Sequence, residues 1–341
     1  MSGKKAHESL LNSGIDVNDN PFIVYDALES NSDLEMLYSV LRRFKDKTER
    51  NPVFTALCLV ANPDFEKIRE NRFFSYEYEP FTTTCEKYPE HERVLELWHT
   101  GINNRLFVPE FHGREHLNIQ RWMRALKAGN KSMLLAFDNS VFGISKNLDG
   151  SIIPEHLAAF DLEFPSDVDY LDNVIRSGTE LFEKLCGYRP RYFVPPNSPG
   201  PSVLQKTLKD CGIDYLNSGR IFKEPLGNKK YRLKFNWPGR INSYGQISLS
   251  RNCFFEPVIN EHPGKDWVFD CLREIKIAFH WHKPAIISTH RVNYAGFIKP
   301  DNRAAGLKSL NELLKQITTI WPEVEFLTST ELGDIIRKSK N

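Results

Sequence analysis

Two histidines spaced four residues apart are the side chains of this chain best placed to do chemistry. His112 and His116 come directly after a short apolar run, residues 106–109, that predicts a strand. Reactive side chains of α/β enzymes usually lie at strand ends. Two neutral imidazoles on one side of a helical turn can share a divalent ion such as zinc. We therefore expect a metal site here, although ordinary surface or capping histidines would have the same spacing.

A third histidine follows another short apolar run. His290 comes just after residues 285–288, which predict a strand, and it could protonate a departing amine or alcohol. Arg291 and Asn293 follow closely and could bind oxygen-rich groups of a substrate. A histidine with satisfied hydrogen bonds, followed by a solvated loop, is the structural alternative.

The stretch after the predicted strand 192–194 is rich in proline. Pro195 and Pro196 fix the backbone and remove two hydrogen-bond donors, which makes this strand exit stiff. Asn197 and the backbone beyond it could line a groove for a substrate. A tight turn before the next helix is the structural alternative.

The segment around the first two histidines also fits His-x-x-Glu-His, the pattern of inverted zinc proteases, with Glu115 as the base. That pattern requires one continuous helix under both rings. Gly113 interrupts such a helix, and the predicted strand runs straight into it. A protease is therefore the less favoured interpretation.

Composition narrows the class of protein further. Lys and Arg total 45 against 44 Asp and Glu, a net charge of +1, so we expect neither nucleic acid nor an anionic membrane as a partner. The six cysteines form no Cys-x-x-Cys pair, which predicts buried thiols in a reducing compartment. We find neither the apolar core of a signal peptide nor a run of roughly 20 apolar residues, so the expected location is the cytoplasm, with no membrane span.

Apolar periodicity predicts alternating strands and helices. The predicted strands cover residues 53–61, 106–109, 133–137, 192–194, 213–216, 285–288 and 324–327. The main predicted helices cover residues 32–44, 90–99, 119–128, 169–186, 202–210, 266–280 and 302–320, and residues 230–250 suggest a hairpin around Pro238-Gly239. Such units favour an α/β fold with a parallel sheet. The lack of glycine-rich phosphate motifs favours a barrel over an open dinucleotide-binding sheet.

The order of these motifs resembles the polysaccharide deacetylase family (the NodB homology domain). More narrowly, it resembles the bacterial polysaccharide (de)acetylase branch associated with surface-sugar biosynthesis. The resemblance spans essentially the whole chain and rests on residues 61–65, 111–116, 195–196 and 287–294. It implies a single domain, 1–341, in which an N-terminal helical segment, 1–50, precedes a distorted (β/α) barrel of about seven strands, 51–341.

The resemblance also implies a function. Enzymes of this family remove an acyl group, usually acetyl, from a sugar, and hold a divalent ion with one Asp and two His. On this mapping His112 and His116 are the metal ligands, with zinc as the expected ion, and His290 is the acid that protonates the leaving amine. Residues 195–198 form the wall of the groove. The residues assigned to substrate binding are Arg114, Pro196, Asn197, Arg291 and Asn293.

One part of the family pattern is missing. The family has an Asp-Asp pair at the end of its first barrel strand, which supplies the base and the third metal ligand, and no Asp-Asp occurs here. The first strand would be absent too, because of a start codon assigned too late or because this is a shortened relative. The expected substitutes are Asp64, Glu110, Glu115, Asp138 and Asp161. An open barrel edge could pair with another copy to form a homo-oligomer. Loss of the base leaves a non-catalytic carbohydrate-binding relative as the alternative function.

Overall fold

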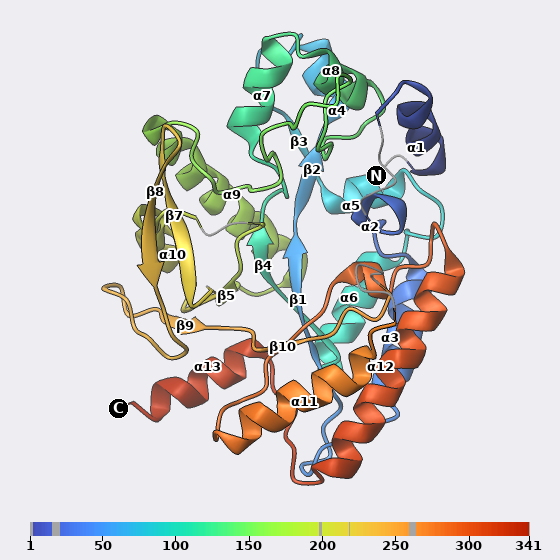
Figure 1. The fold of residues 1–341 in the computed structure, drawn as a ribbon, viewed down its shortest axis with the longest axis vertical. Coiled ribbons are helices and arrows are strands. Elements are labelled where there is room, and N and C mark those ends of the chain that lie inside the picture. Colours follow the sequence, from blue (N-terminus) through green and yellow to red (C-terminus); the bar gives the residue numbers. More distant parts are fainter. Residues whose placement is uncertain (1–2, 16–20, 198–199, 218, 259–263, 341) are drawn as a thin grey trace.

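The computed structural model describes residues 3–15, 21–197, 200–217, 219–258 and 264–340. Its centre is a five-stranded parallel sheet with the order β1-β4-β5-β6-β9 (Figure 1). These strands are β1 (Phe54–Leu59), β4 (Phe107–Gly113), β5 (Tyr192–Phe193), β6 (Tyr215–Asn217) and β9 (Ile247–Leu249). Because all five run in one direction, their carboxyl ends lie at one edge, where α/β sheets carry their ligand sites.

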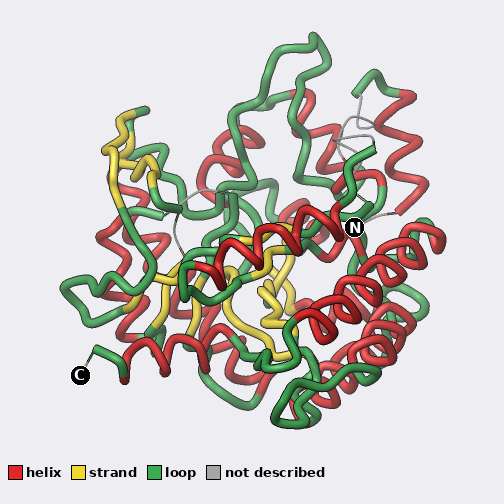
Figure 2. Tube along the Cα trace, turned by 60° about the horizontal axis from the view of Figure 1, so that its bottom comes forward, coloured by secondary structure: helices red, strands yellow, loops and turns green. Residues whose placement is uncertain are grey.

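Two further strands extend this arrangement without closing it. β10 (Cys253–Phe254) pairs in parallel with β11 (Ile287–Ser288). Figure 2 shows the strands at the centre of the molecule with helices around them. Among the described residues no ladder joins β9 to β10 or β11 to β1, so the parallel central sheet of the α/β fold is confirmed, and the distorted barrel with an open edge stays a prediction.

Helices connect and cover the strands. Four of them lie to one side of β1 (Figure 1), and α12 contacts both α3 and α11. They are α3 (Asn31–Leu41), α6 (Val94–Asn103), α11 (Trp267–His280) and α12 (Pro300–Ile320). On the other side α9 (Val168–Cys186) contacts β4 and ends at Gly187, whose φ of +80° suits glycine. The apolar faces of these helices and strands form one large buried core.

A smaller layer lies beyond the carboxyl ends of β1 and β4 (Figure 1). Its own apolar core centres on Trp122 and Phe137, both fully buried. It contains β2 (Ala61–Pro63), β3 (Tyr78–Pro80), α4 (Phe65–Glu70), α7 (Ile119–Lys127) and α8 (Lys131–Asp138). The other elements are α1 (Gly3–Asn12), α2 (Pro21–Val24), α5 (Phe81–Glu86), α10 (Gln205–Asp210), α13 (Ser329–Lys338) and the hairpin β7 (Ile221–Gly227) with β8 (Lys230–Phe235).

Three predicted elements differ from the structure. Residues 133–137, predicted as a strand, belong to α8, because Asn130 caps a helix there by accepting the Met133 N–H at 2.9 Å. The hairpin turn lies between β7 and β8, not at Pro238-Gly239. Residues 324–327 have the composition of a strand but form no ladder, because no strand of the described chain pairs with them.

All six cysteines are buried free thiols, as the sequence predicts. None of the helices in the described ranges has the length and apolar character that crossing a membrane requires.

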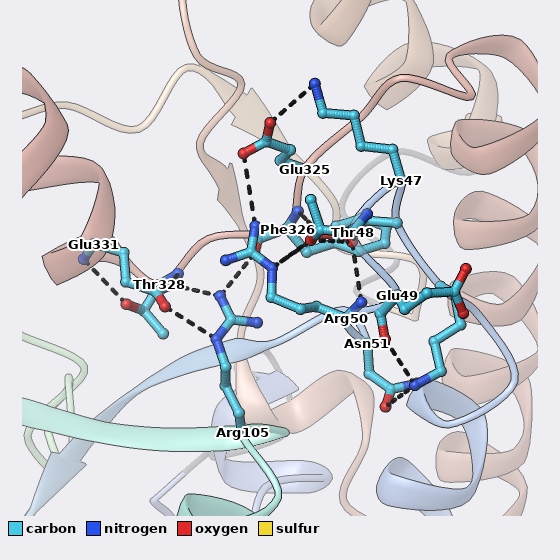
Figure 3. Close-up of polar contacts among 12 residues, drawn as sticks. Lys47, Thr48, Glu49, Arg50, Asn51, Arg105, Glu325, Phe326, Thr328 and Glu331 are labelled. Atoms are coloured by element: carbon cyan, nitrogen blue, oxygen red, sulfur yellow. Dashed lines mark hydrogen bonds and ion pairs between the residues drawn. The ribbon is translucent and has the colours of Figure 1, made fainter.

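Polar contacts join the segment after α3 to the segment before α13 (Figure 3). The buried Asp46 carboxylate accepts hydrogen bonds from the Phe326 N–H at 2.9 Å, from the N–H and hydroxyl of Thr48, and from the Arg50 N–H. Arg105 donates to the Phe326 carbonyl at 2.7 Å. Burial alone would raise the pKa of Asp46, but these hydrogen bonds outweigh it and lower the pKa from 3.8 to about 2.

We predict that Asp46→Asn lowers the free energy of unfolding by about 2 kcal/mol at neutral pH. The folded-state pKa lies below the unfolded one, so this stabilisation is complete above about pH 4 and is lost as the pH falls toward 2. Denaturant unfolding of both proteins across this range measures the difference, which should shrink on acidification. Asp138→Asn, at an exposed ion pair with Arg69, is the control and should cost less than about 0.5 kcal/mol. A difference that does not change with pH contradicts the assignment.

Candidate functional site

His112 lies at the carboxyl end of β4. Its Nδ1 is 2.6 Å from the Val194 carbonyl, just after β5. Since a carbonyl can only accept, this bond places the proton on Nδ1 and leaves the Nε2 lone pair for a ligand. Burial, and then the neighbouring His116, lower the pKa of His112 to about 3. The ring is therefore neutral at physiological pH, as a metal-binding imidazole must be.

The turn after β4 brings His116 back toward His112. The centroids of the two rings are 5.3 Å apart. Gly113 permits this turn with a φ of +137°, and a Cβ there would lie 3.3 Å from the Glu115 carbonyl oxygen. The rings meet across a strand end and a bend rather than along a helix. The expectation that a spacing of four places both rings on one side of a helical turn is therefore wrong. The protease interpretation, which requires that helix, is not supported. Burial lowers the pKa of His116 as well.

Buried groups hold the bend after β4 in place. The N–H groups of Val60 and Ala61 both donate to the Arg114 carbonyl, at 3.2 and 2.9 Å. The Arg114 guanidinium donates to Glu115 at 2.7 Å and lies 4.1 Å from the centroid of the Tyr78 ring. Arg114 was predicted to bind substrate, but its side chain is buried in these contacts and is not among the residues that line the cavity described below. Its role in the structure is to hold the bend.

His290 lies two residues past β11. Its Nδ1 is 2.6 Å from one oxygen of Glu256, and Asn293 donates to the other oxygen at 2.6 Å. This carboxylate fixes the orientation of a ring whose side chain is still 51% exposed. The charge of His290 is among the causes that lower the pKa of His112, so the two rings lie within electrostatic range. Asn293, predicted to bind substrate, is fully buried and supports Glu256.

One cavity of about 2190 Å³ is lined by His112, His116 and His290. Of the predicted groove wall, Pro195 and Asn197 also line it, and Asn197 has a φ of +51°. Pro196 is buried and does not line the cavity. Position 198 lies outside the described residues.

Arg291 also lines the cavity, but its guanidinium is already bound. Asp26 accepts two hydrogen bonds from it, both at 3.0 Å, and Glu29 accepts a third at 2.9 Å. The contact ties the segment before α3 to the strand end that carries His290. The Asp26 carboxylate also opposes the lowering of the pKa of His116, so it lies near the imidazole pair. No local pattern in the sequence singles out Asp26, because its partner is 265 positions away along the chain.

None of the five carboxylates expected to complete the site lines the cavity. Each is bound elsewhere. Asp64 caps α4, Glu110 accepts the Arg191 and Tyr192 N–H groups, and Glu115, Asp138 and Asp161 pair with Arg114, Arg69 and Arg121. Within the described ranges no group of three or more His, Cys, Asp or Glu side chains is arranged to hold a metal ion. A divalent ion at this place would have the two imidazoles as its protein ligands, without a carboxylate from these five residues.

No known protein family and no curated protein matches this chain. Among solved structures, one similar chain comes from Mycobacterium smegmatis and is described as a "putative polysaccharide deacetylase". The two chains share 11% sequence identity. The match covers 98% of this chain and 88% of that one, with a TM-score of 0.44.

We predict that His112 in the metal-free protein stays neutral to well below pH 5, with its proton on Nδ1. Long-range ¹H–¹⁵N NMR spectra recorded in EDTA measure both the tautomer and the titration, and His112→Gln assigns the signals. Because the folded-state pKa is lowered, His112 favours the folded state above about pH 6.5, and this contribution is lost as the pH falls toward 3. A midpoint between pH 6 and 7 would show that the ring is not buried as described.

Proposed function

We propose that this protein is a metal-dependent hydrolase that removes an acyl group from an acylated sugar. The observation that supports it best is that three imidazoles line one cavity: His112 and His116 after β4, and the carboxylate-bound His290 after β11. The substrate class, an N- or O-acylated carbohydrate, comes from the motif order that resembles polysaccharide deacetylases.

His112 and His116 are the proposed protein ligands of a divalent ion, with zinc favoured by their nitrogen donors. An ion held there would polarise the acyl carbonyl and lower the pKa of water. The Val194 carbonyl keeps His112 in the tautomer that can bind a metal. Because no described carboxylate joins the two rings, we expect weaker binding than at a complete three-ligand site.

His290 is the proposed general acid. Glu256 holds its Nδ1 side, so the Nε2–H is the one that can donate to the departing amine or alcohol. The exposed half of the ring leaves room for a sugar to approach.

A second candidate is a non-catalytic carbohydrate-binding protein. The favouring observation is that the five expected carboxylates are bound elsewhere, so none of them can act as the general base in this arrangement. Binding of an N-acetylated oligosaccharide without release of acetate would distinguish this candidate from the hydrolase.

We predict that calorimetric titration with Zn²⁺ or Co²⁺ detects one site. His112→Ala or His116→Ala should weaken it at least tenfold, since each removes one of two nitrogen ligands. The control is His99→Ala, an exposed residue of α6 away from the cavity, which should leave the affinity unchanged. No binding to the intact protein, or equal binding by His112→Ala, would remove the metal from the proposal.

We predict that His290→Ala lowers kcat for acetate release from an N-acetylated oligosaccharide by about 10²–10⁴. Metal affinity should not change, because His290 is not a proposed ligand. Glu256→Gln keeps a hydrogen-bond acceptor but loses the charge, so its kcat should lie between those of the wild type and His290→Ala. Equal acetate release by His290→Ala would exclude this residue as the acid.

A further inference from the structure

The hairpin of β7 and β8 turns an apolar face away from the protein. Its register pairs Ile221 with Phe235 and Lys223 with Leu233. Because residues directly opposite each other in an antiparallel pair share one face, these four side chains lie on the same side of the hairpin. All four are exposed, and Ile221, Leu233 and Phe235 have exposed fractions of 63%, 55% and 58%. An antiparallel sheet usually buries its apolar face and exposes its polar face, so this hairpin has the opposite arrangement.

Contacts of the opposite face fix this orientation. On that face the buried Glu224 carboxylate accepts the Ser202 N–H at 2.7 Å, and Phe222 lines the cavity. The turn is held as well, because the Asn228 N–H donates to the Glu163 carbonyl at 2.7 Å. The hairpin is therefore attached through its inner face and its turn, at the left side of the molecule in Figure 1. Its outer face is left to solvent by the part of the chain that the structure describes.

Positive charge surrounds this face. Residues 220–240 contain seven Lys and Arg and one Glu, a net charge of +6, whereas the whole chain carries +1. The one Glu is Glu224, which is buried and lies 3.5 Å from Lys234. Within the described ranges no carboxylate forms an ion pair with Lys223 or Lys230. The net charge of the whole chain averages over this basic surface, so the expectation of no anionic partner, which rested on that net charge, does not extend to it.

Aromatic side chains continue the apolar face. Tyr231, two residues before Leu233 on the same side of β8, is 52% exposed, and Trp237, just after β8, is 56% exposed. The Arg240 guanidinium lies 4.9 Å from the centroid of the Trp237 ring and donates to the Phe235 carbonyl, which joins this ring to the end of β8. Tyr and Trp rings are enriched at the boundary between lipid headgroups and acyl chains, because each has an apolar body and a polar group.

We propose that the outer face of this hairpin attaches the protein to the surface of an anionic lipid bilayer. The apolar side chains would enter the boundary between headgroups and acyl chains, and the surrounding cations would contact lipid phosphates. A second copy of this chain would bring two surfaces of the same charge together, which is unfavourable. Nucleic acid would neutralise the cations, but Ile221 and Leu233 cannot stack on its bases as aromatic rings do. The proposal rests on the hairpin and not on the proposed enzymatic function.

The experiment measures co-sedimentation of the intact protein with vesicles of equal parts phosphatidylcholine and phosphatidylglycerol. We expect binding that weakens as salt rises and that is at least tenfold weaker with pure phosphatidylcholine vesicles. Lys223→Glu combined with Lys230→Glu should weaken binding to the anionic vesicles at least tenfold, because both cations lie at the proposed contact. The control is Lys308→Glu combined with Lys315→Glu, the same charge change at exposed positions of α12, which should have less than about a twofold effect.

A second measurement tests insertion of the apolar face. Lipids with brominated acyl chains should quench the fluorescence of Trp237, and the quenching should fall in Trp237→Phe but not in Trp281→Phe, which changes the exposed ring that follows α11. Leu233→Ser combined with Phe235→Ser should weaken vesicle binding at least tenfold. Phe269→Ser combined with Ile277→Ser, at similarly exposed positions of α11, should not.

Three results overturn the proposal: no binding to the anionic vesicles, equal binding to the neutral ones, or quenching that Trp237→Phe leaves unchanged. Binding of duplex DNA in place of vesicles, unaffected by Leu233→Ser with Phe235→Ser, would identify nucleic acid as the partner and also overturns it. Binding and quenching by the unmodified protein keep the question decidable even if a double variant fails to fold.

Discussion

The Arg114 carbonyl is the contact on which the candidate site depends. It accepts hydrogen bonds from two consecutive N–H groups at the junction of β1 and β2, and this fixes the bend that follows β4. Gly113 permits the bend, and the buried pair of Arg114 and Glu115 fills the space behind it. Separating this pair would leave an uncompensated buried charge, which is strongly unfavourable. The β1–β2 junction thus contributes to the distance between the imidazoles, together with the Val194 carbonyl that holds the His112 ring.

The electrostatics of the site follow from the same packing. Burial keeps both imidazoles neutral, while the nearby anions Asp26 and Glu29 are already paired with Arg291. A cation held by His112 and His116 would therefore meet neutral donors first. Beyond them lie the paired carboxylates of Asp26 and Glu29 and the carboxylate of Glu155, which also lines the cavity. This arrangement favours nitrogen-preferring ions over Mg²⁺ or Ca²⁺, which require oxygen ligands.

Local patterns in the sequence were sufficient to predict most of the helices and strands, but only part of the candidate site. The continuous apolar run of β1, the capped helix α7 and the glycine end of α9 all follow from neighbouring residues. Residues 133–137 were wrongly predicted as a strand because a short apolar run fits either a strand or a buried helix. In the structure the Asn130 cap stabilises the helix. The positions of Arg114 and Asn293 could not be predicted, because a polar side chain can point to a cavity or away from it with the same sequence. The pairing of Asp26 with Arg291 depends on tertiary contact alone.

Residues 324–327 show that a strand requires a partner segment to pair with, and not only a suitable composition. Their composition favours a strand, yet along the cavity wall they meet Asp46 and Arg105 side chains instead of a backbone partner. β1 shows the converse, since its composition suits burial on both faces while five of its six residues are only half-buried. Solvent in this space would satisfy the backbone groups but leave the apolar walls wet, and an apolar ligand would do the reverse.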